Sequence, residues 1–252
     1  MRIAFPQLGC CAADGRLLGG LLVAILLMRP VAALAAPPSF AAVLAGMQAR
    51  WAVTTDYQCR FETESSNGQT AREVVLAYFY RRPAQIRMEV LEGPYAGSLL
   101  LYNRAVAPRQ VRVRAGNPLV AFLQRMLYGE FFAVDHKWMV DLRGNGIHES
   151  DWTHFIAEHQ KYLRLGATSV FLGEEILNGR KSFRYRLISK DPEKTTSIKE
   201  EEVWVDAETF FPVKYFQYGA DGRLLRKAVT TDLRFNEGLS ERLFLDFDGD
   251  RD

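Results

Sequence analysis

The chain has 252 residues, of which 48% are hydrophobic and 25% charged, and its formal net charge at pH 7 is +2. This near balance gives no electrostatic basis for binding nucleic acid. The sequence also lacks the G-x-S-x-G, S-x-x-K and H-E-x-x-H motifs and a glycine-rich phosphate loop. We therefore expect a protein that is not an enzyme and that has no nucleic-acid partner.

The N-terminal segment has the three parts of a secretory signal peptide. An apolar run, Leu17 to Met28, follows two arginines and precedes the small-residue stretch Val31 to Ala36. The run is shorter than the roughly 20 residues that a membrane-spanning helix needs. We therefore expect cleavage near Ala35, which removes residues 1–35, and a mature protein in the periplasm. An uncleaved anchor is the alternative.

The mature chain is uncharged overall and has a single thiol. Residues 1–35 contain three arginines and one aspartate, so 32 minus 3 basic and 30 minus 1 acidic residues leave 29 of each. Cys59 is then the only cysteine in a compartment that favours disulfides. Stability must come from the core, and we predict one domain over 36–252 with a helical insertion at about 115–166. We expect a monomer.

The mature chain is predicted to begin with a helix and to continue in strands. Ser39 is a good N-cap, and apolar residues from Phe40 to Trp51 recur at helical spacing. Apolar and polar residues then alternate in a way that predicts strands at 55–64, 72–80, 85–91, 98–103 and 110–114. Asn67-Gly68 is a hairpin signal between the first two.

Two helices are predicted to interrupt the strands. Asn117 and Pro118 form an N-cap and a first helical residue for a helix that reaches Gly129. A second helix is predicted from Ser150 or Asp151 to Gly166. The aromatic segment between the helices, around Phe131, Phe132 and Trp138, has no regular pattern.

Strands are predicted again in the last third of the chain. The predicted strands are 168–172, 182–189, 203–206, 211–218 and 226–235. The polar run Lys190 to Glu202 is predicted to be an exposed loop, and Glu200-Glu201-Glu202 is typical of a solvated edge. About ten strands in one antiparallel sheet must curl, because twist accumulates across the sheet. The predicted class is mainly β with α. The residues allow an open half-barrel and a closed barrel equally.

Two blocks of the chain resemble the periplasmic lipoprotein-carrier superfamily, the LolA-like proteins. The C-terminal block runs from Trp204-Val205-Asp206 through Phe211-Pro212-Val213-Lys214-Tyr215 to Leu243-Phe244-Leu245-Asp246-Phe247. The first block comprises Val75 to Pro83, Ile86 to Val90 and Leu99 to Asn103. The resemblance implies an unclosed barrel, a single curled antiparallel sheet whose concave face is covered by helices. It also implies a carrier of a hydrophobic ligand.

The resemblance also implies a role for Arg82, because it matches the family's arginine before a proline. In that family this arginine interacts with the lid helices and matters for ligand uptake and release. The segment Glu92 to Gly97 replaces the family's usual Asp-Gly turn, and the insertion at 115–166 is longer than expected. A different lipid cargo is the natural inference.

A carrier of acyl chains needs an apolar cavity, where each buried CH₂ contributes about 0.8 kcal/mol. Candidate lining residues on the strands are Ile86, Met88, Val90, Leu99, Leu101, Val111 and Val113. Candidates on the insertion helix are Leu119, Phe122, Leu123 and Met126. Arg82, and secondarily Arg87, offers fixed donors for a lid carbonyl, a carboxylate or a lipid phosphate. The alternative is an ordinary packed core with solvated arginines.

Metal and cofactor sites are not expected. His154 and His159 are five residues apart, about 140° around a helix, so they do not share a face. His154 and Glu158 instead have the spacing of a surface pair. Cys59 is expected to be a buried, inert thiol.

The leading hypothesis is a periplasmic carrier or chaperone. It would hold the acyl chains of a lipid or lipidated protein under a helical lid and meet an inner- or outer-membrane partner protein. The alternative is an envelope sensor of the same fold that binds a protein or lipoprotein without transport. A third hypothesis, an enzyme acting on envelope lipid or glycan, requires polar residues that converge inside the cavity.

Overall fold

The computed structural model describes residues 37–249, so the predicted signal peptide lies outside the described residues. The strands are β1 (Asp56–Ser66), β2 (Ala71–Arg81), β3 (Gln85–Glu92), β4 (Leu99–Asn103), β5 (Gln110–Arg114), β6 (Phe131–Ala133), β7 (Thr168–Leu177), β8 (Arg180–Ile188), β9 (Glu200–Asp206), β10 (Pro212–Tyr218) and β11 (Leu224–Phe235). The helices are α2 (Phe40–Val53), α3 (Pro118–Leu127), α4 (Trp152–Arg164) and α5 (Arg242–Leu245), with short 3-10 helices η1 (Ile147–Glu149) and η2 (Pro192–Thr195). None of these helices has the length and apolar character to cross a membrane.

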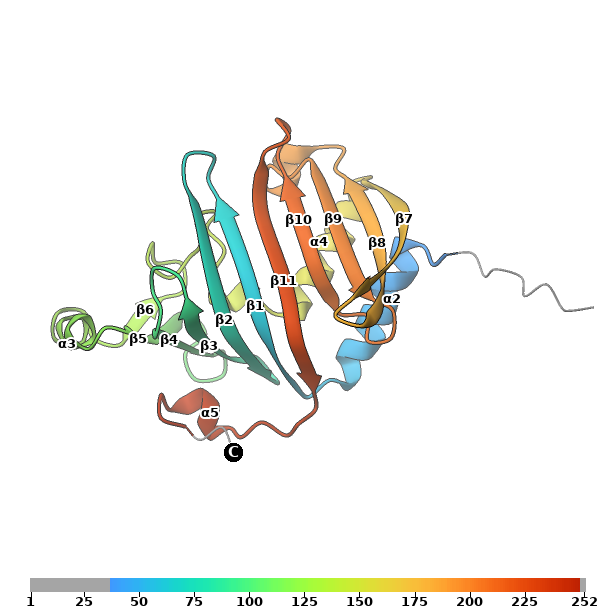
Figure 1. The fold of residues 1–252 in the computed structure, drawn as a ribbon. Coiled ribbons are helices and arrows are strands. Elements are labelled where there is room, and N and C mark those ends of the chain that lie inside the picture. The colour runs from blue at the N-terminus through green and yellow to red at the C-terminus, as the bar shows by residue number, and fades with distance from the viewer. Residues whose placement is uncertain (1–36, 250–252) are drawn as a thin grey trace, which may run out of the picture. The chain divides into compact units, whose positions relative to one another are not determined.

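All the described strands belong to one antiparallel sheet, in the order β6-β5-β4-β3-β2-β1-β11-β10-β9-β8-β7 (Figure 1). The first and last strands of the chain, β1 and β11, pair at its centre, with Tyr57 opposite Phe235 and Ser65 opposite Arg226. The edge strands β6 and β7 do not pair with each other. The predicted fold class, mainly β with α and built on a single unclosed antiparallel sheet, is therefore confirmed, and the described strands do not form a closed barrel.

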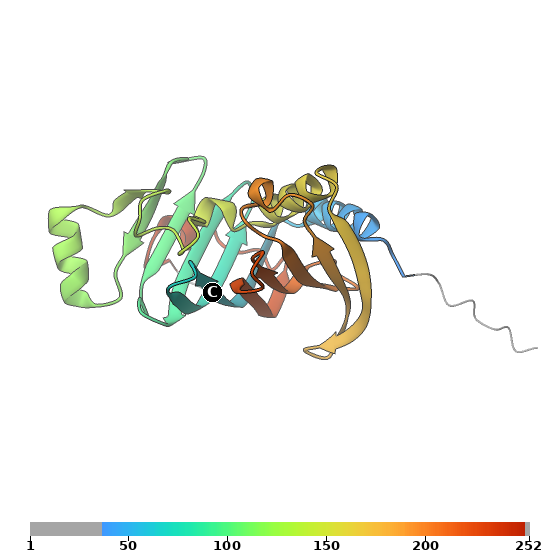
Figure 2. The ribbon, with the colours of Figure 1, turned by 90° about the horizontal axis from the view of Figure 1, so that it is seen from above.

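The helices α2 and α4 cover one face of the sheet, here called the helical face (Figure 2). Ser39 caps α2, because its Oγ accepts a hydrogen bond from the N–H of Ala42 at 3.2 Å. Asp151 caps α4 in the same way, accepting from the N–H of His154 at 3.0 Å. Both predicted helices are confirmed. Their apolar side chains pack with those of β8 and β9, namely Phe40, Val43, Leu44, Met47, Ile156, Tyr185, Leu187, Val203 and Val205.

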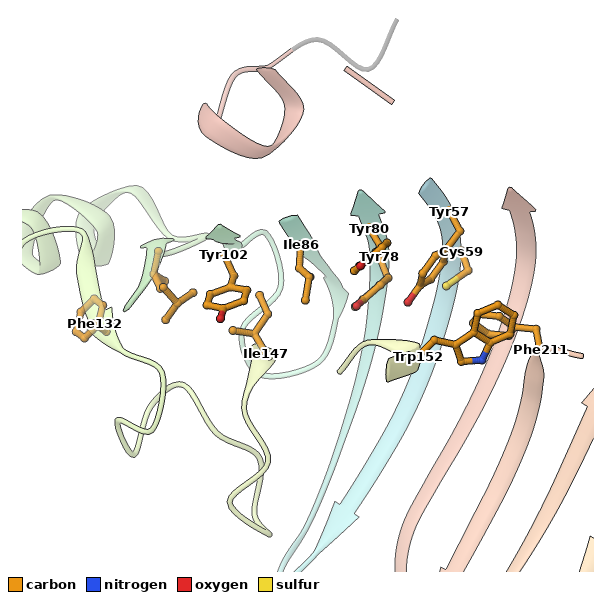
Figure 3. Close-up of a cluster of buried hydrophobic side chains, with 12 residues drawn as sticks. Tyr57, Cys59, Tyr78, Tyr80, Ile86, Tyr102, Phe132, Ile147, Trp152 and Phe211 are labelled. Carbon is orange, nitrogen blue, oxygen red and sulfur yellow. The ribbon is translucent and has the colours of Figure 1, made fainter. Parts of the chain in front are cut away.

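An aromatic cluster fills the centre of the helical face (Figure 3). Tyr57 stacks on Tyr80 with ring centroids 5.2 Å apart, and Trp152 lies 4.3 Å from Phe211 between their centroids. Such rings bury large apolar areas and fix the position of α4 over β1 and β10. Cys59 is buried in the same cluster as a free thiol.

The other face of the sheet, here called the opposite face, is covered in part by the C-terminal segment. Phe244 of α5 packs on Phe79, and Phe247 packs on Leu99 and Leu101. Arg87 is also buried on this face, where it fixes the segment. The C-terminal segment therefore covers the opposite face of the sheet at β2, β3 and β4.

Several segments differ from the sequence prediction. The strand predicted at 168–172 reaches Leu177 as β7, and in the loop predicted to be exposed at 190–202, Thr195 and Ile198 are 1% and 4% exposed. Phe131 to Ala133, predicted to be irregular, forms the short edge strand β6 and pairs with β5. The prediction of a solvated edge at Glu200–Glu202 is wrong for two of the three residues, because Glu201 and Glu202 are 1% and 8% exposed. They lie in β9, which has a strand on either side. Glu201 lies under α4, whereas Glu202 pairs with Arg184 and Arg186 on the opposite face.

Candidate ligand-binding site

A cavity of about 570 Å³ lies on the helical face at the end of the sheet that carries α3. Its floor is made by side chains of β1 to β5, mainly Phe61, Val74, Leu76, Met88, Val90, Leu100 and Val113. Because the side chains of a strand alternate between faces, Met88 and Val90 of β3 both point into the cavity. Pockets of about 300–1,000 Å³ with mostly apolar walls are typical of small-molecule sites.

One wall of the cavity is α3. Asn117 caps this helix by accepting from the N–H groups of Leu119 and Val120 at 2.9 and 3.2 Å. Gln124 ties it to the sheet, because its Nε2 donates to the carbonyl of Val113 at 2.8 Å and its Oε1 accepts from the N–H of Ala115 at 3.2 Å. None of the helix's own residues is buried. The predicted helix is confirmed, and it is attached to the sheet mainly through the hydrogen bonds of Gln124.

The helix presents two apolar faces. The inward face lines the cavity through Val120, Leu123, Gln124 and Leu127. The outward face consists of Leu119, Phe122 and Met126, which are 67%, 64% and 61% exposed and do not line the cavity. Only one of the two faces is available to a ligand in the cavity.

The second wall is the segment 138–150, where Trp138, Met139 and Ile147 contribute apolar side chains. Asp141 holds this segment in shape: its Oδ1 accepts from the backbone N–H of Arg143 at 2.8 Å and of Asn145 at 3.0 Å. The Asp-to-Asn spacing is a local turn signal in the sequence. This pattern could have predicted from the sequence that the segment 138–150 contains an ordered turn.

The predicted site residues are distributed over several places. Met88, Val90 and Leu123 line the cavity, as does Val113. Ile86 and Val111 are fully buried in the aromatic cluster beside it. Leu99 and Leu101 pack under Phe247 on the opposite face, and Leu119, Phe122 and Met126 form the outward face of α3.

Arg82 contacts the end of α2 rather than the cavity. Its Nε donates to the carbonyl of Thr54 at 2.5 Å and its Nη2 donates to the carbonyl of Trp51. Its guanidinium also lies 4.8 Å from the centroid of the Trp51 ring. Arg82 therefore binds the C-terminal carbonyls of α2, and it does not line the cavity.

Arg87 is 2% exposed and holds the C-terminal segment. Its Nη1 donates to the carbonyls of Leu243 and Asp246 at 3.0 Å each, and its Nη2 donates to that of Phe247 at 3.0 Å. Its Nε lies 2.7 Å from Oε1 of Glu89. Arg87 therefore lies on the opposite face of the sheet and does not line the cavity.

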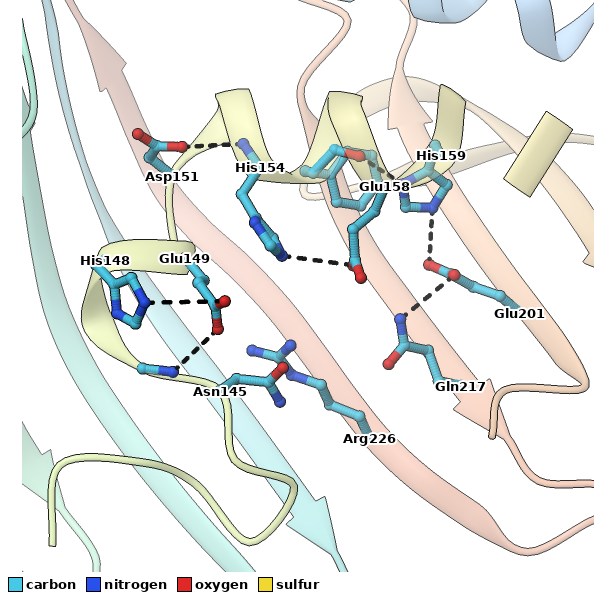
Figure 4. Close-up of polar contacts among 12 residues, drawn as sticks. Asn145, His148, Glu149, Asp151, His154, Glu158, His159, Glu201, Gln217 and Arg226 are labelled. Atoms are coloured by element: carbon cyan, nitrogen blue, oxygen red, sulfur yellow. Dashed lines mark hydrogen bonds and ion pairs between the residues drawn. The ribbon is translucent and has the colours of Figure 1, made fainter. Parts of the chain in front are cut away.

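A second, smaller cavity of about 80 Å³ adjoins the first. The two share four lining residues, Phe61, Glu149, Ser150 and Arg226. Polar side chains surround the smaller cavity, among them Asp151, His154, Glu158, His159 and Gln217 (Figure 4). The combined site therefore has a large apolar part and a small polar part.

A buried ion pair lies at the polar end. Nε2 of His159 is 3.2 Å from Oε1 of Glu201, and both side chains are 1% exposed. Nδ1 of His159 lies 2.7 Å from the carbonyl oxygen of Phe155, to which it donates. Burial lowers the pKa of His159, but the carboxylate of Glu201 and the hydrogen bond to it outweigh this, so the pKa is raised. The charged form of the imidazole is favoured.

The thiol in this region is not an activated nucleophile. Burial, with a smaller contribution from Asp232, raises the pKa of Cys59 well above its ordinary value. Among residues 37–249 there is also no group of three His, Cys, Asp or Glu side chains that could hold a metal ion. The arrangement of the described residues fits ligand binding through burial and hydrogen bonding.

No family model matches the chain, and no curated protein matches it either. Among solved structures, it is similar to an uncharacterised conserved protein from Thermus thermophilus, with 12% identity, a TM-score of 0.49 and coverage of 84% of this chain and 96% of that one. It is also similar to a LolA superfamily protein from Nitrosomonas europaea, with 11% identity, a TM-score of 0.37 and coverage of 82% and 98%. A third is the Pseudomonas aeruginosa MucA/MucB complex, with 16% identity, a TM-score of 0.41 and coverage of 82% and 60%.

Proposed function

We propose that this protein binds and carries a lipid, or the acyl chains of a lipidated protein, in the bacterial envelope. The observation that carries the proposal is the cavity of about 570 Å³ between the sheet, α3 and the segment 138–150. The pocket is partly open to solvent, and it differs from the aromatic cluster beside it, where side chains pack closely as in other protein interiors. The walls are mainly apolar, as acyl chains require.

The apolar contribution to binding grows with the length of the acyl chain. Burying about ten methylenes contributes roughly 8 kcal/mol, from which the costs of association, about 4 kcal/mol or more, are subtracted. The net free energy corresponds to a dissociation constant no tighter than about 1 mM. A longer chain or a second chain is therefore needed for a dissociation constant near 1 μM.

Uptake and release of a long chain are easier when the partly open pocket widens, and α3 is the element that supports this. It contributes no fully buried residue and is tied to the sheet mainly through Gln124. Elements with few buried contacts open at low free-energy cost. We propose that α3 is the lid, and that a signal peptide places the mature protein in the periplasm, where it exchanges cargo with a membrane partner protein.

Displacement of a fluorescent fatty acid from the purified mature protein tests the proposal. The two faces of α3 supply a matched pair of variants, Leu123→Asp on the inward face and Phe122→Asp on the outward face. We expect the fatty acid to bind wild type and Phe122→Asp with similar affinity and Leu123→Asp at least about tenfold more weakly. Equal binding to all three proteins would contradict the proposed cavity.

A second candidate function is a sensor module that binds a partner protein without carrying cargo. The outward face of α3 favours this sensor function. Leu119, Phe122 and Met126 form an exposed apolar stripe there, and soluble monomers rarely expose large apolar patches. This function predicts that Phe122→Asp loses binding to the partner protein. Partner binding retained by Phe122→Asp would contradict it.

A further inference from the structure

Arg226 of β11 lies where the two cavities meet, and its side chain lines both (Figure 4). Its strand partners are Ser65 of β1 and Gln217 of β10, which face the larger and the smaller cavity respectively. The guanidinium also lies 5.7 Å from the centroid of the Tyr215 ring. A ligand that enters the apolar cavity with its chains therefore brings its polar end toward this arginine.

The guanidinium has an unused donor. Nε of Arg226 is buried and has no hydrogen-bond acceptor among residues 37–249. The carboxylate of Asp141 is 4.0 Å away, beyond hydrogen-bonding distance. Asp141 cannot readily turn toward it, because its Oδ2 accepts from Nδ2 of Asn145 at 2.8 Å and its Oδ1 holds the turn described above. A buried donor without an acceptor is costly, so an acceptor supplied by the ligand would be stabilising here.

The charge of Arg226 is already balanced by its surroundings. Burial alone lowers the pKa of this group, but its neighbours raise it above the ordinary value; they are Tyr215, Asp141, Glu158 and Glu201. Glu149 also lines both cavities. Two further cations lie nearby: Arg143 donates to the carbonyl of Thr196, and Arg72, which lines the larger cavity, lies 5.3 Å from the centroid of the Tyr95 ring. The imidazoles of His154 and His159 face Glu158 and Glu201. An anionic group beside Arg226 would therefore meet several carboxylates.

We propose that the ligand carries an uncharged hydrogen-bond acceptor, an ester or amide carbonyl, directly beside its acyl chains, and that the guanidinium of Arg226, whose side chain is 21% exposed, donates to this carbonyl. The inference rests on the proposed function, because the chains must occupy the adjoining apolar cavity. It adds the chemical class of the ligand: an acylated neutral or zwitterionic amphiphile in preference to an anionic one. Nothing in the proposal requires the carbonyl to react.

The test compares two soluble ligands with equal chains, dioctanoylglycerol and dioctylglycerol ether, which lacks the carbonyls. Each displaces an uncharged fluorescent hydrocarbon probe from wild type and from Arg226→Met. We expect Arg226→Met to weaken binding of the ester about tenfold or more and to leave the ether almost unchanged. An equal change for both ligands, or none, would overturn the inference while binding of the probe still supports the cavity. If wild type bound none of the probe, the ester and the ether, the proposed function and the inference would both be overturned.

A second variant tests the charge preference without altering Arg226. Glu158→Gln removes one of the surrounding carboxylates, and its side chain is half-buried beside His154. We expect wild type to prefer dioctanoylglycerol over anionic dioctanoylphosphatidylglycerol, and Glu158→Gln to narrow that preference several-fold. Tighter binding of the anionic lipid by wild type would overturn the preference, as would an unchanged ratio in the variant.

Discussion

Leu100 and Leu101 are neighbours on β4 that face opposite sides of the sheet. Leu100 lines the apolar cavity, whereas Leu101 is buried under Phe247 on the opposite face. The two side chains are chemically identical and adjacent in the chain. Leu100 therefore faces the proposed ligand-binding cavity, whereas Leu101 packs in the core between the sheet and the C-terminal segment.

Substitution of these two leucines is expected to have different consequences. Leu100→Asn should weaken fatty-acid binding about tenfold or more with a small loss of stability, since it places a polar group in the cavity wall. Leu101→Asn should lower the free energy of unfolding by about 2–5 kcal/mol and leave the affinity of the folded protein unchanged. Denaturant unfolding and the displacement assay measure the two effects. If Leu101→Asn weakened binding and Leu100→Asn did not, the ligand would instead bind on the opposite face of the sheet.

Gln124 is expected to control the opening of α3. Gln124→Ala removes the side-chain hydrogen bonds to Val113 and Ala115, each of which contributes about 1 kcal/mol. Amide hydrogen exchange over 117–128 should accelerate about tenfold or more, and ligand should dissociate faster. Gln110→Ala on β5, an exposed residue, is the control and should change neither rate. An unchanged exchange rate in Gln124→Ala would contradict the role of α3 as a weakly held lid.

The pair of His159 and Glu201 predicts the sign of a pH effect on stability. Because the folded-state pKa of His159 is raised above the ordinary 6.5, its contribution is complete below that value and is lost as pH rises through the raised pKa. In Glu201→Gln, burial is the largest remaining influence and lowers the pKa of His159, opposed only by the hydrogen bond to Phe155 and the charge of Glu158. Stability should therefore instead be lost as pH falls below about 6.5.

Thermal unfolding between about pH 5 and pH 8 measures this reversal. Glu201→Gln should also lower the free energy of unfolding at pH 6 by about 3 kcal/mol, the cost of breaking a buried pair. The matched control is Glu158→Gln, which breaks the half-exposed pair with His154 at 3.8 Å and should cost less than about 1 kcal/mol. If the melting temperature depended on pH in the same way in wild type and Glu201→Gln, the assigned ion pair of His159 and Glu201 would be contradicted.

Arg87 is expected to support the fold rather than the ligand. Arg87→Gln loses donors to the carbonyls of Leu243, Asp246 and Phe247, so residues 236–248 should become sensitive to limited proteolysis. The free energy of unfolding should fall by about 3 kcal/mol, as for loss of one partner of a buried charged network. Arg109→Gln, at an exposed position, is the control. Loss of ligand affinity without loss of stability would instead support a direct role in binding.

Local patterns in the sequence were sufficient for most elements of this fold. The caps at Ser39, Asn117 and Asp151 act within one helical turn, so each is readable from a few neighbouring residues. Alternation likewise locates strands, but it does not say which face meets the cavity. Leu99-Leu100-Leu101 is apolar on both faces, and only the docking of Phe247 distinguishes them.

The polar end of the site depends on contacts between distant parts of the chain. Glu201 belongs to a charged run that resembles a solvated edge, yet it is buried because α4 places His159 above it. Arg226 has no motif around it, and its position follows from the pairing of β11 with β1 and β10. Neither position is encoded within a short window of sequence.

The most direct test of the central claim is native mass spectrometry, with lipid extraction, of protein purified from the periplasm. We predict an added mass that extraction identifies as an acyl lipid, present in wild type and Phe122→Asp and absent from Leu123→Asp. Protein of unmodified mass that also fails to bind a hydrophobic dye would contradict the claim that the cavity holds acyl chains.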